Sequence, residues 1–271
     1  MSDKSVRNLL LSLGVLTGAS LIAPFFSTHD PLVISIGERL LQPNHVHWMG
    51  TDDLGRDLFS RVLHGAALTM SVSVAALLSS LVLGALLGAA AGYYYERWPD
   101  KLFCWFTDFL TSIPFLIIIA AVLSLTGPGL EKAYLVLTAI MWTSPARIVR
   151  AEVIKTLPLE YVTAERAMGA PEWQILFVTV MPSCMSTALL FSVSYLPEII
   201  ALEAGLSFLG LGVQPPRPAL GKIIYEGIGL LPGSWWLSIF PAGILLMLVA
   251  GVQIAGWLAQ AGENNIKGNF S

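Results

Sequence analysis

The sequence predicts an all-α membrane protein with six transmembrane helices, on the basis of its composition and its long apolar segments. Apolar residues make up 55% of the 271 positions and charged residues 12%, with a mean hydropathy of +0.71. A soluble domain carries about 25% charged residues, so one aqueous core could not bury this much apolar surface. In lipid, every spanning segment must satisfy its own backbone hydrogen bonds, which favours helices.

Six apolar segments are long enough to cross a bilayer, since a spanning helix needs roughly 20 mostly apolar residues. The second segment is the richest in small residues and contains Gly84 and Gly88 in a GxxxG pattern. Small residues let helix backbones approach closely, so we expect this helix inside the bundle, or alternatively at a dimer contact. The predicted spans are residues 8–27, 66–92, 102–126, 133–150, 184–204 and 237–258.

The first apolar segment follows Lys4 and Arg7, as the apolar part of a signal peptide would. It lacks a clear small-x-small cleavage site and ends at Pro24, so we expect a retained anchor helix. Lys and Arg are enriched on the cytoplasmic side of membrane proteins. Their distribution over the loops predicts that both termini and the polar insert at 151–182 are cytoplasmic.

We expect one transmembrane domain over residues 1–271, without an appended soluble domain. Its predicted parts are an anchor helix with a periplasmic segment (1–65), a core (66–258) that contains the insert 151–182, and a cytoplasmic tail (259–271). The net charge of −3 and the lack of a basic run exclude nucleic acid as a partner. Cys104 and Cys184 fall in or beside spans, and we expect both to be free thiols.

Within the insert, two short helical patterns flank Gly169 and Pro171. Glycine permits a tight break between helices, and proline suits the first turn of the second helix. We expect one apolar face on each helix. The first face consists of Tyr161, Ala164 and Met168, and the second of Trp173, Leu176, Phe177 and Val180.

This helix-turn-helix has two interpretations. A soluble partner could bind it, or it could rest on lipid headgroups as an interfacial helix. Interfacial helices usually carry Lys and Arg on the polar face, whereas Arg166 is the single basic residue between positions 156 and 182. The pattern therefore favours a docking surface for a soluble partner.

Four segments carry a family resemblance. Residues 47–57 read HWMGTDDLGRD, residues 142–150 read WTSPARIVR, and residues 203–216 read EAGLSFLGLGVQPP. The insert has a small-residue triad at 163–165, then Gly169, then Pro182 thirteen residues later. Together these segments resemble the permease subunits of ABC importers for dipeptides, oligopeptides and nickel, over about residues 45–255. The resemblance points to the subunit usually encoded second, and the insert is similar to the EAA loop of that family.

The resemblance implies a type I ABC importer permease in a bacterial inner membrane, itself without catalytic activity. The implied partners are a homologous second permease subunit, two ATP-binding-cassette ATPases, a periplasmic or lipid-anchored substrate-binding protein, and membrane lipid. No cofactor is expected in this chain, because the ATPases would bind ATP and Mg²⁺. The sequence itself contains no G-x-x-x-x-G-K-[ST] phosphate loop.

The ATPase-coupling residues follow from the match to the EAA loop. They are Glu160, Tyr161, Thr163, Ala164, Glu165, Gly169 and Pro182. The loop departs from the family pattern at its triad, which reads Thr-Ala-Glu instead of Glu-Ala-Ala. It also departs at Thr179, where an apolar residue is usual, and at Met181, where leucine is usual. We expect the coupling role to persist with altered contacts.

The periplasmic signature residues are His47, Gly50, Thr51, Asp52, Gly55, Arg56 and Asp57. Their charges could pair internally and fix the chain where it re-enters the membrane, or they could dock the substrate-binding protein. Internal pairing is the favoured interpretation. The carboxylates lack the ligand count of a calcium loop.

All four histidines of the chain, His29, His45, His47 and His64, precede the second predicted span. Imidazole and thioether groups suit borderline metals, so His45, His47 and Met49 suggest metal entry. However, His47 belongs to the family signature whatever the substrate. We therefore expect no metal site.

Carboxylates inside a span are costly, at about 2.5–3.5 kcal/mol on insertion scales, and are usually functional. Glu198 follows Pro197 in the middle of the fifth predicted span, and Glu203 lies near its outer end. The candidate path residues are therefore Glu198, Glu203 and Pro197. Glu198 could attract a cationic or ammonium-bearing substrate, or it could pair with a polar group of a neighbouring subunit.

Two other functions would leave different marks in the sequence. A secondary transporter driven by an ion gradient would show internal repeats and paired broken helices, whereas Pro114 and Pro197 are in-span breaks without matching context. A membrane-embedded enzyme would need clustered reactive residues, and motifs such as HExxH are lacking. Peptide and metal-chelate importers share the signatures above, so the sequence leaves the substrate open.

Overall fold

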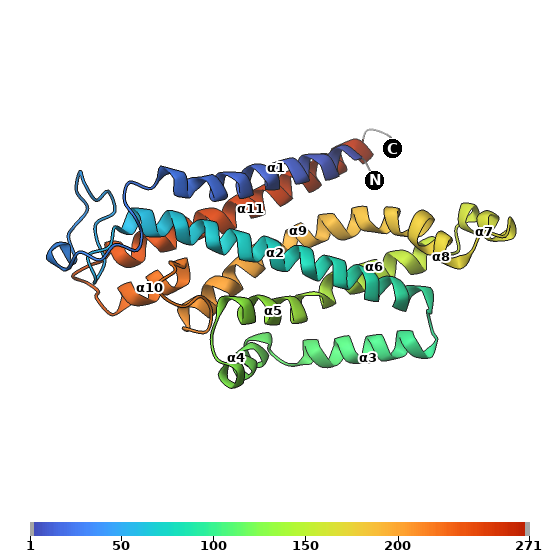
Figure 1. The fold of residues 1–271 in the computed structure, drawn as a ribbon. Helices are drawn as coiled ribbons and strands as arrows, with labels where there is room; N and C mark the ends of the chain where they lie inside the picture. Colours follow the sequence, from blue (N-terminus) through green and yellow to red (C-terminus); the bar gives the residue numbers. More distant parts are fainter. Residues whose placement is uncertain (1–2, 269–271) are drawn as a thin grey trace.

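A computed structural model describes residues 3–268 as an elongated bundle of helices (Figure 1). In this range the regular secondary structure is helical, apart from one isolated bridge between Thr51 and Asp57. The all-α prediction is therefore confirmed.

The helices follow one another along the chain as long and short elements. The α-helices are α1 (Asp3–Ile22), α2 (Leu58–Tyr93), α3 (Trp98–Ser112), α4 (Phe115–Thr126), α5 (Leu130–Met141), α6 (Thr143–Thr156), α7 (Glu160–Ala167), α8 (Glu172–Gln174), α9 (Met181–Phe208), α10 (Leu220–Ile228) and α11 (Trp236–Gly268). Short 3-10 helices cover Ala23–Phe26 and Ile36–Glu38, and a π-helix covers Ile175–Val180.

Helix α2 forms the long axis of the bundle. Its 36 residues span about 54 Å at 1.5 Å per residue, well beyond the roughly 30 Å of a hydrocarbon core. The helix begins directly after Asp57, whose side chain accepts a hydrogen bond from the backbone N–H of Ser60 at 2.8 Å. The helix therefore begins eight residues before the predicted span 66–92.

Three helical stretches are long and apolar enough to span a membrane singly. They are Leu58–Tyr93, Glu172–Phe208 and Trp236–Leu258, which contain the whole of the second, fifth and sixth predicted spans. The first predicted span corresponds to a shorter apolar helix, Leu11–Phe26. The total of six spans remains a prediction.

The third predicted span, 102–126, is not one straight helix. Helices α3 and α4 meet at 84°, with Ile113 and Pro114 between them. A proline disfavours the helical conformation of the residue before it, and Ile113 is accordingly extended, with φ −96° and ψ 129°. This pair is either one broken span or a re-entrant turn.

The fourth predicted span, 133–150, is also interrupted. Helix α5 ends at Met141 and α6 begins at Thr143, with Trp142 between them. Pro145 has no N–H and cannot donate to the carbonyl of Met141, which accounts for the break. Helix α6 then continues to Thr156, beyond the predicted end.

Small residues bring α2 and α6 into backbone contact. A Cβ added at Gly88 would lie 2.2 Å from the carbonyl oxygen of Ala146, and one at Gly84 would lie 2.7 Å from that of Trp142. The GxxxG pattern thus serves packing within this chain.

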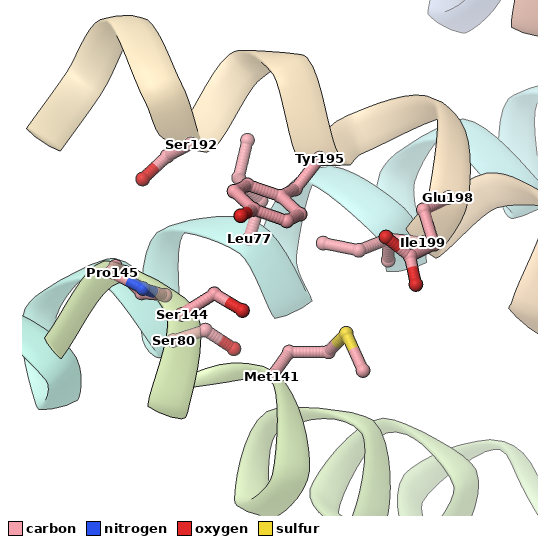
Figure 2. Close-up of a pocket in the computed structure, with 9 residues that line it drawn as sticks. All are labelled: Leu77, Ser80, Met141, Ser144, Pro145, Ser192, Tyr195, Glu198 and Ile199. Atoms are coloured by element: carbon pink, nitrogen blue, oxygen red, sulfur yellow. The ribbon is translucent and has the colours of Figure 1, made fainter. Parts of the chain in front are cut away.

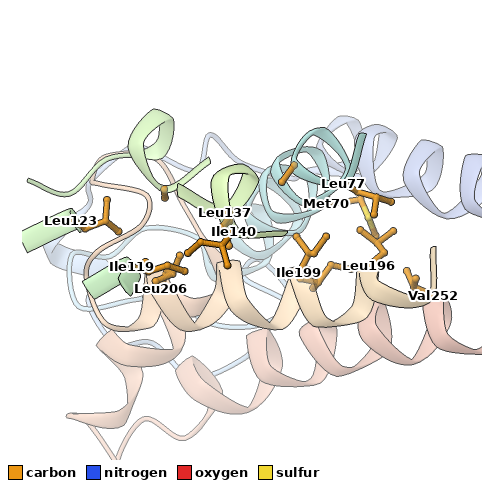
Figure 3. Close-up of a cluster of buried hydrophobic side chains, with 13 residues drawn as sticks. Met70, Leu77, Ile119, Leu123, Leu137, Ile140, Leu196, Ile199, Leu206 and Val252 are labelled. Carbon is orange, nitrogen blue, oxygen red and sulfur yellow. The ribbon is translucent and has the colours of Figure 1, made fainter. Parts of the chain in front are cut away.

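An apolar cluster unites α2, α4, α5, α9 and α11 beside this contact. Its buried members include Leu77, Leu137 and Leu196; Figure 3 shows Leu77 close to Leu196, and Leu137 farther along the cluster beside Ile140. The cluster holds the bent pair α3–α4 to the rest of the bundle through Ile119 and Leu123 of α4, both fully buried.

The bundle has two distinct ends. Helices α7 and α8 lie at the same end as the start of α1 and the end of α11 (Figure 1). Helix α10 and the segment between α1 and α2 lie at the opposite end. The two polar regions that the sequence singles out are therefore separated by the length of the bundle.

Candidate coupling insert and translocation pocket

The insert folds as α7, a tight turn, and the start of the long helical stretch 172–208. Val162 of α7 is fully buried and packs in a cluster with Val153 of α6 and Ile175 of the π-helix. This apolar contact anchors α7 to the ends of two long helices. A movement of α7 would therefore be transmitted to α6 and α9.

The turn after α7 depends on Gly169. Its φ is +87°, in the left-handed region that side chains rarely adopt. A Cβ at this position would meet nothing within 4 Å, so the requirement is conformational and not a lack of space. The structure shows the tight turn that the sequence predicts at this position.

Two polar contacts cross the turn and join its arms. Arg166 binds Glu172 with two hydrogen bonds, Nε–Oε1 at 2.9 Å and Nη2–Oε2 at 3.1 Å. The hydroxyl of Thr179 donates to Oε2 of Glu165 at 2.6 Å. Glu165 and Thr179 are two of the departures from the family pattern, and the fold brings them together.

The exposed surface of the insert differs from the predicted faces. Trp173 and Phe177 are 64% and 50% exposed, whereas Leu176 and Val180 are buried. The prediction of one shared face is wrong, because the π-helix at Ile175–Val180 changes the angular spacing from that of an α-helix.

A large apolar surface remains uncovered at this end of the molecule. Tyr161 is 48% exposed and Met168 79% exposed, beside Trp173 and Phe177. Exposed groups of this size usually mark an interaction site. Five more of the predicted coupling residues are exposed here as well: Glu160, Thr163, Ala164, Gly169 and Pro182.

At the opposite end, the signature segment 47–57 forms a tight loop that leads into α2. Thr51 and Asp57 pair as an isolated bridge, and Gly50 and Gly55 both have positive φ. Nδ1 of His47 lies 2.8 Å from Oδ1 of Asp57. The loop is thus closed by its own side chains.

Charged groups of this loop and of the start of α2 form a buried network. Arg56 Nε lies 2.6 Å from Asp52 Oδ2, and Arg61 Nη1 lies 2.9 Å from the same oxygen. All three residues are at least 90% buried. Their internal pairing supports the structural interpretation of this segment.

Glu226 of α10 completes the network. Its Oε2 lies 3.4 Å from Arg61 Nη2 and 4.0 Å from Arg56 Nη2, and burial raises the pKa of its carboxyl. Arg61 and Glu226 are not among the site residues that the sequence predicts. The available signal was the basic Arg61 at the start of an apolar span, which needs an acidic partner.

Glu198 lies at a polar cavity in the middle of the bundle. The cavity has a volume of about 100 Å³ and lies between α2, α6 and α9 (Figure 2). Four hydroxyl-bearing residues share its lining with Glu198: Ser80, Ser144, Ser192 and Tyr195. The sequence predicts Glu198 as a path residue but does not indicate these hydroxyl residues, because they come from three separate helices.

The other two path candidates lie in different surroundings. Glu203 is 3% exposed and accepts a hydrogen bond from the hydroxyl of Ser207 at 2.8 Å. Pro197 is buried, and the helix continues through it to Phe208. Both residues therefore lie within the packing of this chain and not on its open surface.

Comparison with known proteins relates this geometry to a family. The family described as "Binding-protein-dependent transport system inner membrane component" matches residues 80–261. The chain is 34% identical to the dipeptide transport system permease protein DppC of Bacillus subtilis over 238 residues, covering 88% of this chain and 74% of the relative. It is 32% identical to the oligopeptide permease OppC of the same organism, over 94% of this chain and 83% of that one.

A glutathione transport system permease protein, GsiD of Pectobacterium atrosepticum, is also 32% identical, over 79% of this chain and 71% of the relative. Among solved structures, an inward-facing MetNI methionine ABC transporter matches with a TM-score of 0.58 at 22% identity. That match covers 74% of this chain and 95% of the other. It shows the type I importer fold.

Proposed function

Because this chain belongs to the family of binding-protein-dependent transport system inner membrane components, we propose that its cargo is a short peptide. The chain is a non-catalytic permease subunit of an ABC importer and a multi-pass protein of the inner membrane. Relatives named for dipeptide and oligopeptide transport support the substrate class.

The polar cavity at Glu198 is the structural observation that carries this proposal. A carboxylate in mid-membrane needs a partner, and the ammonium group of a peptide N-terminus is a suitable one. The hydroxyls of Ser144 and Tyr195 supply donors and acceptors for the peptide amide groups. Glu198 is itself exposed on this chain, so it can face a pathway shared with a second subunit.

A transport assay on the assembled importer, reconstituted with its binding protein, tests the cargo and the path together. Glu198→Gln removes the charge and should reduce peptide uptake while assembly and ATP hydrolysis remain. As the matched control, Glu203→Gln alters a buried carboxylate and should lower thermal stability instead. Uptake of peptide by Glu198→Gln at the wild-type rate would contradict the proposal, as would retention of a metal chelate by the binding protein.

For energy coupling, we infer that an ATP-binding-cassette ATPase docks on the insert. Three observations support this: the exposed apolar surface at Met168 and Trp173, the buried anchor Val162, and the rigid turn at Gly169. A groove on the ATPase would cover the exposed groups. Closure of the ATPases would then move α7 and, through it, α6 and α9.

We further propose an assembly of two homologous permease subunits, two ATPases and one substrate-binding protein. The insert and both termini would face the cytoplasm, and α10 with the signature segment would face the periplasm. Thiol labelling in a chain without Cys104 and Cys184 tests this orientation. A cysteine at Ser35 should react with an impermeant reagent in spheroplasts, and one at Glu172 should not; the reverse pattern would overturn the orientation.

A further inference from the structure

Three metal-binding side chains meet at the end of the molecule opposite the insert. One ligand atom from each of His29, His47 and Asp57 lies within 4.8 Å of the other two. Nδ1 of His29 lies 3.8 Å from Oδ1 of Asp57, and Nδ1 of His47 lies 2.8 Å from the same oxygen. The two imidazole rings are 4.8 Å apart, centroid to centroid.

The surroundings of this cluster leave room for an ion and carry negative charge. A cavity of about 220 Å³ is lined by the three residues together with Asp30 and Glu38. Oε2 of Glu38 lies 3.9 Å from Nε2 of His47, on the side of the ring away from Asp57. Carboxylates therefore face both nitrogens of the His47 ring.

The backbone holds the three ligands in place. The N–H of His29 donates to the hydroxyl of Ser60 at 3.1 Å, which fixes the exit of the first helix against the start of α2. Oδ2 of Asp57 accepts from the N–H of Ser60 at 2.8 Å, so Oδ1 remains directed at the histidines. The sequence pattern suggests His45 as the partner of His47. In the structure His45 is exposed, and His29 lies beside His47 instead.

We propose that His29, His47 and Asp57 bind a divalent cation of the zinc class. Zinc takes imidazole nitrogen and carboxylate oxygen at about 2.0–2.2 Å, so two ligands on one ion lie at most about 4.4 Å apart. The distances from Asp57 to both histidines meet this limit, and the half-exposed ring of His29 can turn toward His47. Water or a further carboxylate fills the fourth position.

Binding requires the neutral ring of His47 to change tautomer, with no net loss of a proton. In the metal-free state a proton on Nδ1 of His47 can be shared with Asp57, and the ion replaces that proton as the link between the two groups. The hydrogen of His47 then resides on Nε2, where the Glu38 carboxylate can accept it and orient the ring. The ion cross-links the exit of the first helix to the loop that enters α2.

Zinc binding to the full-length chain in detergent, after treatment with a chelator, tests the proposal. Elemental analysis after dialysis against limiting Zn²⁺ should find one ion per chain, and Co²⁺ substitution should give the absorption bands of a low-coordinate site. His29→Ala removes a ligand whose ring is half exposed, so the variant should fold normally and bind Zn²⁺ at least tenfold more weakly. His45→Ala is the matched control and should bind like the wild type.

The thermal midpoint gives a second readout, because an ion that binds the folded state stabilises it. Zn²⁺ should raise the midpoint of the wild type and of His45→Ala but not that of His29→Ala. Retention of no ion by the wild type would overturn the proposal. Equal affinity in wild type and His29→Ala, or a loss confined to His45→Ala, would overturn it as well by placing the ion elsewhere.

Discussion

The hydroxyl of Thr179 donates a hydrogen bond to the carboxylate of Glu165 across the turn of the insert, at 2.6 Å. Both residues differ from those that are usual in the family, and each is the hydrogen-bond partner of the other. A carboxylate in the triad is compatible with this fold because a hydroxyl takes the place of the usual apolar side chain. The bond ties α7 to the base of the fifth span, where coupling movements would have to pass.

The bond between Glu165 and Thr179 can be measured by a double-mutant cycle. Thr179→Val keeps the shape of the side chain and should lower the free energy of unfolding by about 1 kcal/mol. Denaturation in mixed detergent micelles measures this change. The double variant, Glu165→Ala with Thr179→Val, should lose less free energy of unfolding than the two single variants lose together. Thr163→Val, whose hydroxyl bonds only within α7, is the control. Strict additivity would show that the bond contributes nothing.

The glycine contact between α2 and α6 predicts a large effect from a small change. In Gly88→Ala, the new methyl group would lie 2.2 Å from the carbonyl oxygen of Ala146, so the two helices must separate. Overpacking of this kind costs about 1–3 kcal/mol, and the thermal midpoint should fall accordingly. Gly243→Ala in α11 has open space around it and should leave the midpoint unchanged. Equal thermal midpoints for Gly88→Ala and Gly243→Ala would refute the close approach of α2 and α6.

The partly buried carboxyl of Glu226 predicts a pH dependence at the end that carries α10. Its pKa is raised above the ordinary 4.5 by burial, although Arg61 and Arg56 oppose the shift. Because the folded state binds the proton of Glu226 more tightly than the unfolded state does, this proton stabilises the fold fully below pH 4.5. The contribution is lost as the pH rises through the raised pKa of the folded state. The wild type should therefore lose stability over this window relative to Glu226→Gln. Parallel melting curves for the two proteins between pH 4 and 7 would contradict the assignment.

The turn at Gly169 predicts a defect in coupling without a defect in assembly. Valine at this position would have to adopt a left-handed conformation, which costs about 1–2 kcal/mol or more for a β-branched residue. We expect Gly169→Val to insert and to bind its partners, while stimulation of the ATPase by loaded binding protein falls. Gly229→Val, at a glycine with negative φ and open space, should retain full stimulation.

Much of the architecture was predictable because it depends on local sequence. The cores of α2, α9 and α11 follow from apolar length, and the turn at Gly169 follows from a glycine placed two residues before a proline. The bend between α3 and α4 was less predictable, because proline has two outcomes in a membrane helix. Pro114 ends its helix, whereas the helix continues through Pro197.

The parts that escaped prediction depend on contacts between distant segments. Glu165 and Thr179 are 14 residues apart, and Arg61 and Glu226 are 165 apart, so no local pattern indicates either pair. The π-helix at Ile175–Val180 cannot be read from an apolar pattern that assumes α-helical spacing. His29 joins His47 only because the segment after the first helix folds back onto the start of α2.

Site-directed cross-linking tests most directly whether an ATPase docks on the insert. In a chain without Cys104 and Cys184, cysteine at Met168, which is 79% exposed, would be cross-linked in the purified importer. We predict a product that contains one permease subunit and one ATPase and that is absent when the cysteine is placed at Ser35. A cross-link to the ATPase from Ser35, with none from Met168, would contradict the account.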